Sequence, residues 1–381
     1  MRMLDKEKLK TALSSLMEDE IANRRVRGAH FAVMQNGEPA FNGVFGEKSP
    51  GEALTPDCVY RIASMTKPVT ALAFLLECAA GRLHPEDRLC DYLPEYEHMK
   101  VARPTPDGYE ITGEAKTPIL MWHLLSHVSG IGCDDLGNRL FDELPAGDKR
   151  SLASVADAMS RVPLAFEPMT RSAYSATAAF DVCARVIELT SGLPYERYLR
   201  ERIFEPLGMK DTTFRPSEDQ WARMISMTDV DANGEFIVSD TVPGCVFESL
   251  AYPSAGAGLA STTDDYVKFV SFLLGDGALP DGGRLLPAEV LSLMRSPQVP
   301  AALMSKTETW GLGVRVITGD DHWLDKGTFG WSGAYGTHFW ADPQNRVVAV
   351  YMRNGRNITD LSDGTNAMIR FEKAVASSFA G

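Results

Sequence analysis

Ser64 and Lys67 stand three positions apart at the start of an apolar segment that runs from Tyr60 to Leu83. A serine hydroxyl becomes an effective nucleophile when a nearby base removes its proton, and a lysine held in a pocket can be that base. Positions three apart share a helix face, so the Lys67 amine can reach the Ser64 hydroxyl. The S-x-x-K spacing therefore predicts acyl transfer through a serine nucleophile. A helix-capping serine with a snorkelling lysine is the plainer interpretation of an isolated motif.

The residues after Lys67 predict a buried helix. Nearly every position from Val69 to Leu76 is apolar, and Gly81 ends the pattern. Ser64 would then lie at the helix N-terminus, where unpaired backbone N–H groups and the helix dipole favour developing negative charge. No other serine in the chain has a lysine three positions later.

The two ends of the chain carry strand patterns, whereas the middle carries helical ones. Short apolar runs in segments 29–46 and 311–352 flank turn signals at Asn36-Gly37 and Asp342-Pro343. Helical spacing occurs in segments 5–23, 65–80, 121–125, 154–160, 177–190, 195–204, 264–274 and 360–379. We predict an α+β fold in which residues 1–63 and 295–381 build an antiparallel sheet flanked by the terminal helices, with a mainly helical part, 64–294, inserted. A crevice between the two parts is the expected binding site.

Composition excludes several classes of function. The formal charge of -13 is the wrong sign for binding nucleic acid or anionic lipid. We expect a cytoplasmic protein, because no apolar segment is long enough to cross a membrane and the first residues lack a secretory signal. The six cysteines show no metal-ligand spacing, so we expect neither disulfides nor a metal site.

The chain resembles the serine β-lactamase superfamily, in the branch that holds class C β-lactamases, D-alanyl-D-alanine carboxypeptidases and family VIII carboxylesterases. "RIASMTKPVTA" is similar to the nucleophile motif of that family, "MWHLLSHVSGI" to the segment that follows it, and "YSATAAFDVCARVIELTSG" to the stretch with its tyrosine motif. "SAGAGLASTTDDYVKF" and "FGWSGAYGTHFW" complete an ordered set that covers nearly the whole chain. The resemblance implies a single β-lactamase/transpeptidase-like unit over residues 1–381.

The resemblance also implies roles for individual residues. Tyr174 would lie beside Ser64 and Lys67 and share proton handling with them. The backbone N–H groups of Ser64 and Ala334 would form the oxyanion hole, and the third motif, Trp331-Ser332-Gly333, would contact the substrate. No metal or organic cofactor is implied.

Two departures from the family pattern bear on the substrate. The family's Y-x-N motif reads Tyr174-Ser175-Ala176, and Trp331 stands where β-lactamases and carboxypeptidases have lysine or histidine. Loss of an amide and of a cation weakens the case for penicillins and peptides, and favours small, fairly apolar esters. A hairpin centred on Asp342-Pro343-Gln344-Asn345 would place Arg353 opposite Ala334, where it could restore a cation, although a solvated or paired arginine is the simpler interpretation.

Several alternatives stay open. Gly330-Trp331-Ser332-Gly333-Ala334 nearly spells the elbow of α/β-hydrolases, but a strand follows it where an elbow needs a helix. His123 and His127 are four apart on a predicted helix, without the Glu of a zinc motif or a third ligand, which favours a structural role.

We therefore predict a carboxylesterase of the β-lactamase-like type, with acyl transfer as a variant of the same reaction, that acts on a small-molecule ester or amide. β-Lactamase, carboxypeptidase or D-amino-acid amidase activity is one alternative, and a non-catalytic ligand-binding protein is another. Acyl preference depends on the long loops 105–117 and 132–149, and the sequence does not indicate an oligomeric state.

Overall fold

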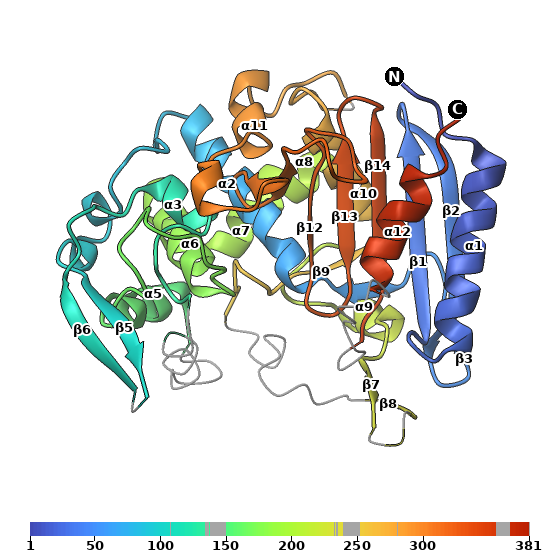
Figure 1. Ribbon diagram of the computed structural model, residues 1–381, viewed down its shortest axis with the longest axis horizontal. Coiled ribbons are helices and arrows are strands. Elements are labelled where there is room, and N and C mark those ends of the chain that lie inside the picture. The colour runs from blue at the N-terminus through green and yellow to red at the C-terminus, as the bar shows by residue number, and fades with distance from the viewer. Residues whose placement is uncertain are drawn as a thin grey trace.

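The computed structural model describes residues 1–106, 108–133, 137, 150–231, 233, 235–238, 252–279, 281–355 and 366–380. Within these residues, eight strands form one antiparallel sheet in the order β10-β11-β12-β13-β14-β1-β2-β3 (Figure 1). The strands are β1 Gly28–Gln35, β2 Glu38–Ser49, β3 Glu52–Ala53, β10 Glu308–Trp310, β11 Arg315–Ile317, β12 Phe329–Ser332, β13 His338–Asp342 and β14 Val347–Met352. The prediction of an α+β fold whose sheet is built from both ends of the chain is confirmed.

The two ends of the chain meet where β1 pairs with β14, with Ala32 opposite Val350. Every residue of β13 and β14 is buried, because helices cover both faces of the sheet. The Asn36-Gly37 turn joins β1 to β2 as predicted, with both residues at positive φ.

Helices α1 (Lys6–Ala22) and α12 (Ala367–Ala376) cover one face of the sheet (Figure 1). The Asp5 side chain caps α1 by accepting from two backbone N–H groups of its first turn. Leu4 and Phe379 form a β-bridge, so the two termini lie together. The helix predicted over 360–379 is shorter in the structure, and residues 356–365 lie outside the described residues.

Helix α10 (Thr263–Leu274) packs against the opposite face of the sheet, on β13, β14 and β1. It comes from the segment predicted as the helical part, so the boundary between the two parts is less sharp than predicted. Next to it runs α2 (Thr66–Ala79), in which all positions from Thr66 to Glu77 are buried. The apolar run in the sequence therefore does form a central helix.

Helices α6 (Ala178–Ser191) and α11 (Ala288–Met294) pack against α2. The other α-helices of the described residues are α3 Met121–Leu125, α5 Leu152–Ser160, α7 Tyr195–Leu199, α8 Glu205–Leu207 and α9 Glu218–Arg223, and a π-helical turn spans Arg200–Phe204. The small strand pairs are β4 Val59–Arg61 with β9 Ala260–Thr262, β5 Lys100–Thr105 with β6 Gly108–Glu114, and β7 Thr228–Val230 with β8 Phe236–Val238.

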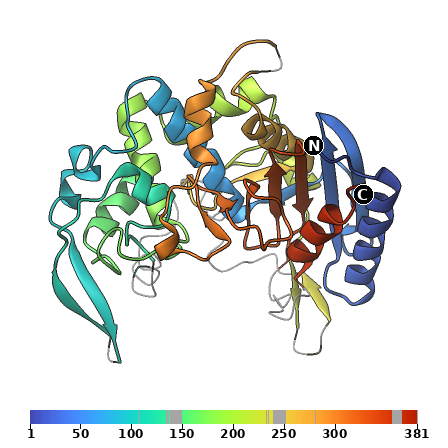
Figure 2. The same cartoon turned by 45° about the horizontal axis from the view of Figure 1, so that its top comes forward.

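One predicted loop is wrong. Most of segment 105–117 is strand β6, which pairs with β5 in a hairpin that projects from the body in both views (Figures 1 and 2). Every residue of β6 is exposed, so the strand lacks the buried apolar face that would have marked it in the sequence. Most of the second predicted loop, 132–149, lies outside the described residues.

The described parts of the chain contain no helix long and apolar enough to cross a membrane. Five cysteines are free thiols: Cys58, Cys78, Cys90, Cys133 and Cys183. Cys245 lies outside the described residues.

Candidate active site

The nucleophile motif forms a tight turn between β4 and α2. After β4, residues Ala63–Met65 form a 3₁₀ turn that continues directly into α2. Ala63 has a φ of 44°, a left-handed conformation that is strained for a residue with a side chain and that often marks functional sites. Ser64, which follows it, is half-buried at the head of the central helix.

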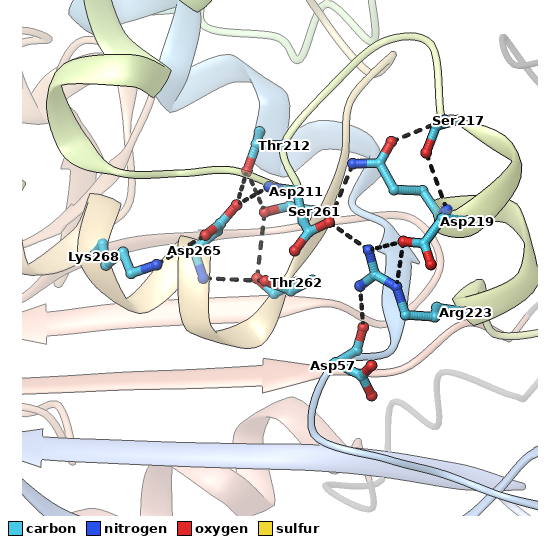
Figure 3. Close-up of polar contacts among 11 residues, drawn as sticks. Asp57, Asp211, Thr212, Ser217, Asp219, Arg223, Ser261, Thr262, Asp265 and Lys268 are labelled. Atoms are coloured by element: carbon cyan, nitrogen blue, oxygen red, sulfur yellow. Dashed lines mark hydrogen bonds and ion pairs between the residues drawn. The ribbon is translucent and has the colours of Figure 1, made fainter.

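A polar network holds the strand pair from which this turn emerges (Figure 3). The guanidinium of Arg223 donates to the Asp57 carbonyl at 2.7 Å and contacts the carboxylates of Asp211 and Asp219. Asp265, in the first turn of α10, accepts from the backbone N–H of Asp211 at 2.7 Å. These contacts connect the residues before β4, helix α9 and the start of α10, and so fix β4 against β9.

Lys67 lies in the first turn of α2 and is fully buried. Its Nζ donates to Ser64 Oγ at 3.3 Å, to the Ala176 carbonyl at 2.5 Å and to the Gly256 carbonyl at 2.9 Å. The three N–H donors of the lysine ammonium match these three oxygen acceptors. Lys67 is therefore held within hydrogen-bond distance of the Ser64 hydroxyl.

Tyr174 completes the predicted group from the segment before α6. The Lys67 Nζ lies 4.8 Å from the centre of its ring, and the residue is 39% exposed, so it borders both the buried amine and solvent. Burial raises the pKa of the Tyr174 phenol, but the positive charge of Lys67 and hydrogen bonding with Lys67, Ser64 and Trp331 outweigh it, so the net pKa is lowered. The structure brings Ser64, Lys67 and Tyr174 together.

The turn between β12 and β13 lies against the nucleophile turn. A side chain at Gly333 would come within 2.3 Å of the Ile62 carbonyl, so only glycine allows this approach. Thr337 Oγ1 donates to the same carbonyl at 3.1 Å. Ala334 directly follows Gly333 and is exposed, and the Ile62 that Gly333 contacts lies two residues before Ser64.

An aromatic wall borders Tyr174. The Trp331 ring lies 5.5 Å from the Tyr174 ring and 4.6 Å from the Trp310 ring, centre to centre. His127 packs against Tyr174 at 4.7 Å and against Trp310 at 4.5 Å. Trp331 thus lies next to the predicted catalytic group, on an apolar surface.

Ser332, predicted to contact the substrate with Trp331, lies with its side chain on the other face of β12. Successive residues of a strand point to opposite faces. Ser332 Oγ contacts His338 Nδ1 at 2.9 Å, and His338 Nε2 contacts Glu372 of α12 at 3.0 Å. The Ser332 side chain is therefore not brought to Ser64.

The predicted position of Arg353 is wrong by two residues. The β13–β14 hairpin pairs His338 with Tyr351, which puts Arg353 beside Gly336 and not opposite Ala334. The Arg353 side chain is 8% exposed and donates to the Arg25 carbonyl at 3.2 Å. It therefore restores no cation beside Trp331.

His123 and His127 do not share a helix, since α3 ends at Leu125 and His127 has a φ of 57°. His127 Nδ1 accepts from the backbone N–H of Ser175 at 3.1 Å, which supports the chain directly after Tyr174. Burial and the nearby charge of Lys67 hold the pKa of His127 well below its usual value. Within the described residues, no group of three potential ligands could hold a metal ion.

Sequence reasoning missed Trp310 and the two carbonyls that hold Lys67. Trp310 comes from β10, more than 130 residues from Tyr174, and no local pattern connects the two. Backbone carbonyls carry no side-chain signature. The only available signal for Gly256 is the residue type, because its Cα lies so close to Thr177 that a side chain would come within 2.7 Å of the Thr177 Cα.

Comparisons with known proteins give a family profile, sequence relatives and similar folds. Residues 13–370 match the profile described as Beta-lactamase. Protein Rv1367c of Mycobacterium tuberculosis is 32% identical over 321 residues, which cover 79% of each protein. Esterase EstB of Burkholderia gladioli is 27% identical over 379 residues, which cover 92% of each. The structure of EstCE1, described as a hydrolase with promiscuous acyltransferase activity, matches the fold with a TM-score of 0.80 at 21% identity over 97% of this chain and 99% of that one.

Proposed function

Because this chain belongs to the Beta-lactamase family, we propose that it is a serine hydrolase that cleaves small, fairly apolar carboxylic esters through an acyl-enzyme. The observation that carries the proposal is the convergence of three groups, with Lys67 Nζ 3.3 Å from Ser64 Oγ and 4.8 Å from the centre of the Tyr174 ring. Esterase EstB, which resembles this chain over nearly its full length, supports the same class of reaction.

In the acylation step, Ser64 Oγ attacks the ester carbonyl carbon. The O–H bond breaks as the proton passes to the coupled pair of Lys67 and Tyr174, and the carbonyl electrons move to oxygen. The backbone N–H groups of Ser64 and Ala334 stabilise this oxyanion, and one such donor contributes about 3 kcal/mol in other serine hydrolases. The intermediate then collapses, the ester C–O bond breaks, and Tyr174 passes the proton to the leaving alcohol.

Deacylation repeats these steps with a new nucleophile. Water attacks the acyl-enzyme while the same pair accepts its proton, and Ser64 leaves with a proton returned to it. An alcohol in place of water would transfer the acyl group to that alcohol. The matching fold of EstCE1, which is described as having promiscuous acyltransferase activity, is a reason to test acyl transfer to alcohols.

The aromatic wall favours an apolar acyl group. Trp331 and Trp310 provide a neutral surface next to Tyr174, backed by the buried side chains of Val128 and Val299. A β-lactam or a peptide stem carries a carboxylate, and the candidate cation, Arg353, lies elsewhere. The Ala176 carbonyl accepts a hydrogen bond from Lys67, and the alanine side chain has no amide that could bind a peptide substrate.

We also propose that the protein works in the cytoplasm on a small molecule, without a metal or organic cofactor. Cys58 and Cys183 are free thiols, and a reducing compartment such as the cytoplasm keeps cysteines in that state. Cell fractionation with an antibody against the protein, and metal analysis of the purified enzyme, test these points.

Mass spectrometry of the intact protein tests the reaction class. The protein is exposed briefly to p-nitrophenyl acetate, p-nitrophenyl butyrate and nitrocefin, and the mass of each covalent adduct is compared with turnover. We expect acetyl and butyryl adducts on Ser64 with fast turnover of both esters, and little turnover of nitrocefin. Faster turnover of nitrocefin would favour a β-lactamase, and absence of every adduct would favour a non-catalytic binding protein. Ser64→Ala is the control for labelling elsewhere.

A further inference from the structure

A buried carboxylate on α6 organises the loop that contacts Lys67. Asp181 is fully buried, seven residues after Tyr174. It accepts hydrogen bonds from the Tyr252 hydroxyl, from Ser254 Oγ at 3.3 Å, and from the backbone N–H groups of residues 255 and 256 at 2.6 and 3.2 Å. One side chain therefore fixes the whole of segment 252–256.

This loop delivers its carbonyl groups to α2. The Gly256 carbonyl accepts from Lys67 Nζ at 2.9 Å, and the Ala255 carbonyl accepts from Thr70 Oγ1 at 2.7 Å, one helical turn further on. On its other side, Gly256 presses against Thr177, next to the Ala176 carbonyl that also holds Lys67. The amide that Asp181 binds and the carbonyl that Lys67 binds thus belong to the same residue.

We propose that Asp181 is a positioning residue: by binding the amides of residues 255 and 256, it holds the Gly256 carbonyl where the carbonyl keeps the Lys67 amine against Ser64. The proposal rests on the proposed function and names a further residue on which acylation depends. Asp181 touches neither Ser64 nor the place of the substrate, so its effect passes through the loop and Lys67.

The pKa of the Asp181 carboxyl lies within the pH range in which activity can be measured. Burial raises the pKa of its carboxyl to about 6, although the hydrogen bonds from Tyr252 and the loop amides, and the charge of Lys67, lower it. The titratable groups that face it are Lys67 from α2, Tyr195 from α7 and Tyr252 from the loop itself. When the carboxyl is protonated it loses charge and acceptor strength toward the loop amides. Acylation should therefore weaken as the pH falls through about 6.

The pre-steady-state burst of p-nitrophenol from p-nitrophenyl acetate, measured from pH 5 to pH 9, tests this inference. For Asp181→Asn we expect acylation to be about 10- to 100-fold slower, in a protein that still unfolds cooperatively. Its rate should also lack the fall near pH 6, the acidic limb of the pH profile, that we expect for wild type. For Tyr252→Phe we expect the limb to move to higher pH, because a hydrogen bond that favours the ionised carboxylate is lost. Tyr96→Phe is the matched control, since its buried hydroxyl donates to the Ala156 carbonyl and not to Asp181, so the pH dependence should stay unchanged.

The outcomes separate the two proposals. The role of Asp181, but not the esterase, is overturned by either of two results. One is a burst in Asp181→Asn as fast as in wild type, and the other is an acylation rate that falls at the same pH in Tyr252→Phe as in wild type. Should Asp181→Asn fail to fold, the shift of the limb in Tyr252→Phe still decides. A wild-type protein that releases p-nitrophenol neither in a burst nor in the steady state overturns both.

Discussion

Two serines in this molecule hydrogen-bond to a nitrogen base, one on each face of the region around β12. Ser64 lies 3.3 Å from Lys67 Nζ, with Tyr174 beside the amine. Ser332 lies 2.9 Å from His338 Nδ1, and His338 Nε2 lies 3.0 Å from Glu372. Judged by atom types alone, the second group looks more like a catalytic triad than the first.

The surroundings of the two serines differ more than their partners do. Ser64 stands in a 3₁₀ turn at the head of α2, where the first N–H groups of a helix lack intrahelical acceptors. Ser332 stands in a strand paired residue by residue with β13, so its backbone belongs to a ladder. His338 is 2% exposed beneath α12.

The electrostatics of the two groups differ in the same sense. Burial raises the pKa of Glu372, but Arg315 and His338 lower it by more, so the net pKa is about 2. The carboxylate also accepts a hydrogen bond from Trp323 Nε1 at 2.7 Å. That carboxylate is fully engaged in holding α12 to the sheet. The comparison shows that the two serines share a nitrogen partner and differ in what a nucleophile also requires, which is free oxyanion donors and an open side.

The largest effect is expected at Ser64. Ser64→Ala should reduce kcat/KM for p-nitrophenyl butyrate by about 10⁴- to 10⁶-fold and abolish the acyl adduct, because it removes the attacking oxygen. Steady-state kinetics and peptide mapping of the adduct measure this. An adduct found on the peptide that contains Ser332 would reverse the comparison.

Removal of the phenol should rank next. Tyr174→Phe should lower kcat/KM by about 10²- to 10⁴-fold, because it removes the phenol that we propose as part of the proton-accepting pair, while the ring still packs against Trp331. The variant should keep its fold, which circular dichroism checks. A rate within threefold of wild type would exclude Tyr174 from proton transfer.

Glu372→Gln should affect stability more than catalysis. The folded-state pKa of about 2 lies below the usual 4.5, so this carboxylate stabilises the fold above pH 4.5 and loses its contribution as the pH falls toward 2. We expect the variant to be less stable than wild type by on the order of 1–3 kcal/mol at pH 7, because Arg315 and His338 lose a charged partner. Urea unfolding at pH 7, 4.5 and 3 measures the difference.

That difference should shrink with decreasing pH, and kcat/KM at pH 7 should stay within about tenfold of wild type. A folded Glu372→Gln protein that has lost acylation completely would assign the second group a catalytic part. A stability difference that does not depend on pH would mean that the ionised carboxylate is not what holds α12.

The sequence predicts an element of the fold well where the residues that specify it are adjacent in the chain. The apolar run after Lys67 predicted α2, and Asn36-Gly37 predicted the β1–β2 hairpin, because both signals lie in adjacent residues. The β13–β14 register failed because Asp342 pairs with Val347, so the loop is centred between Gln344 and Asn345, one residue further along the chain than the predicted centre. A shift of this kind moves Arg353 by two residues.

The candidate site divides in the same way. Ser64 and Lys67 are neighbours in sequence, and Tyr174 came from the resemblance. The contacts of Ser332 join β12, β13 and α12, which no local pattern connects, although alternation along a strand would already have placed Ser332 and Trp331 on opposite faces.

The smallest effect is expected at Ser332, where the comparison is sharpest. Ser332→Ala removes the hydroxyl that hydrogen-bonds with His338 Nδ1 and leaves that buried nitrogen without its partner, which should cost about 1–3 kcal/mol of stability. Catalysis should stay within about threefold of wild type, because Gly333 is held against Ile62 by its own close packing and by Thr337, independently of Ser332. Thermal unfolding and kcat/KM, measured on the same preparation, check both halves. A hundredfold loss of rate in a stable protein would mean that the Ser332–His338 contact positions the turn at Ala334, and the two faces of β12 would then belong to one catalytic unit.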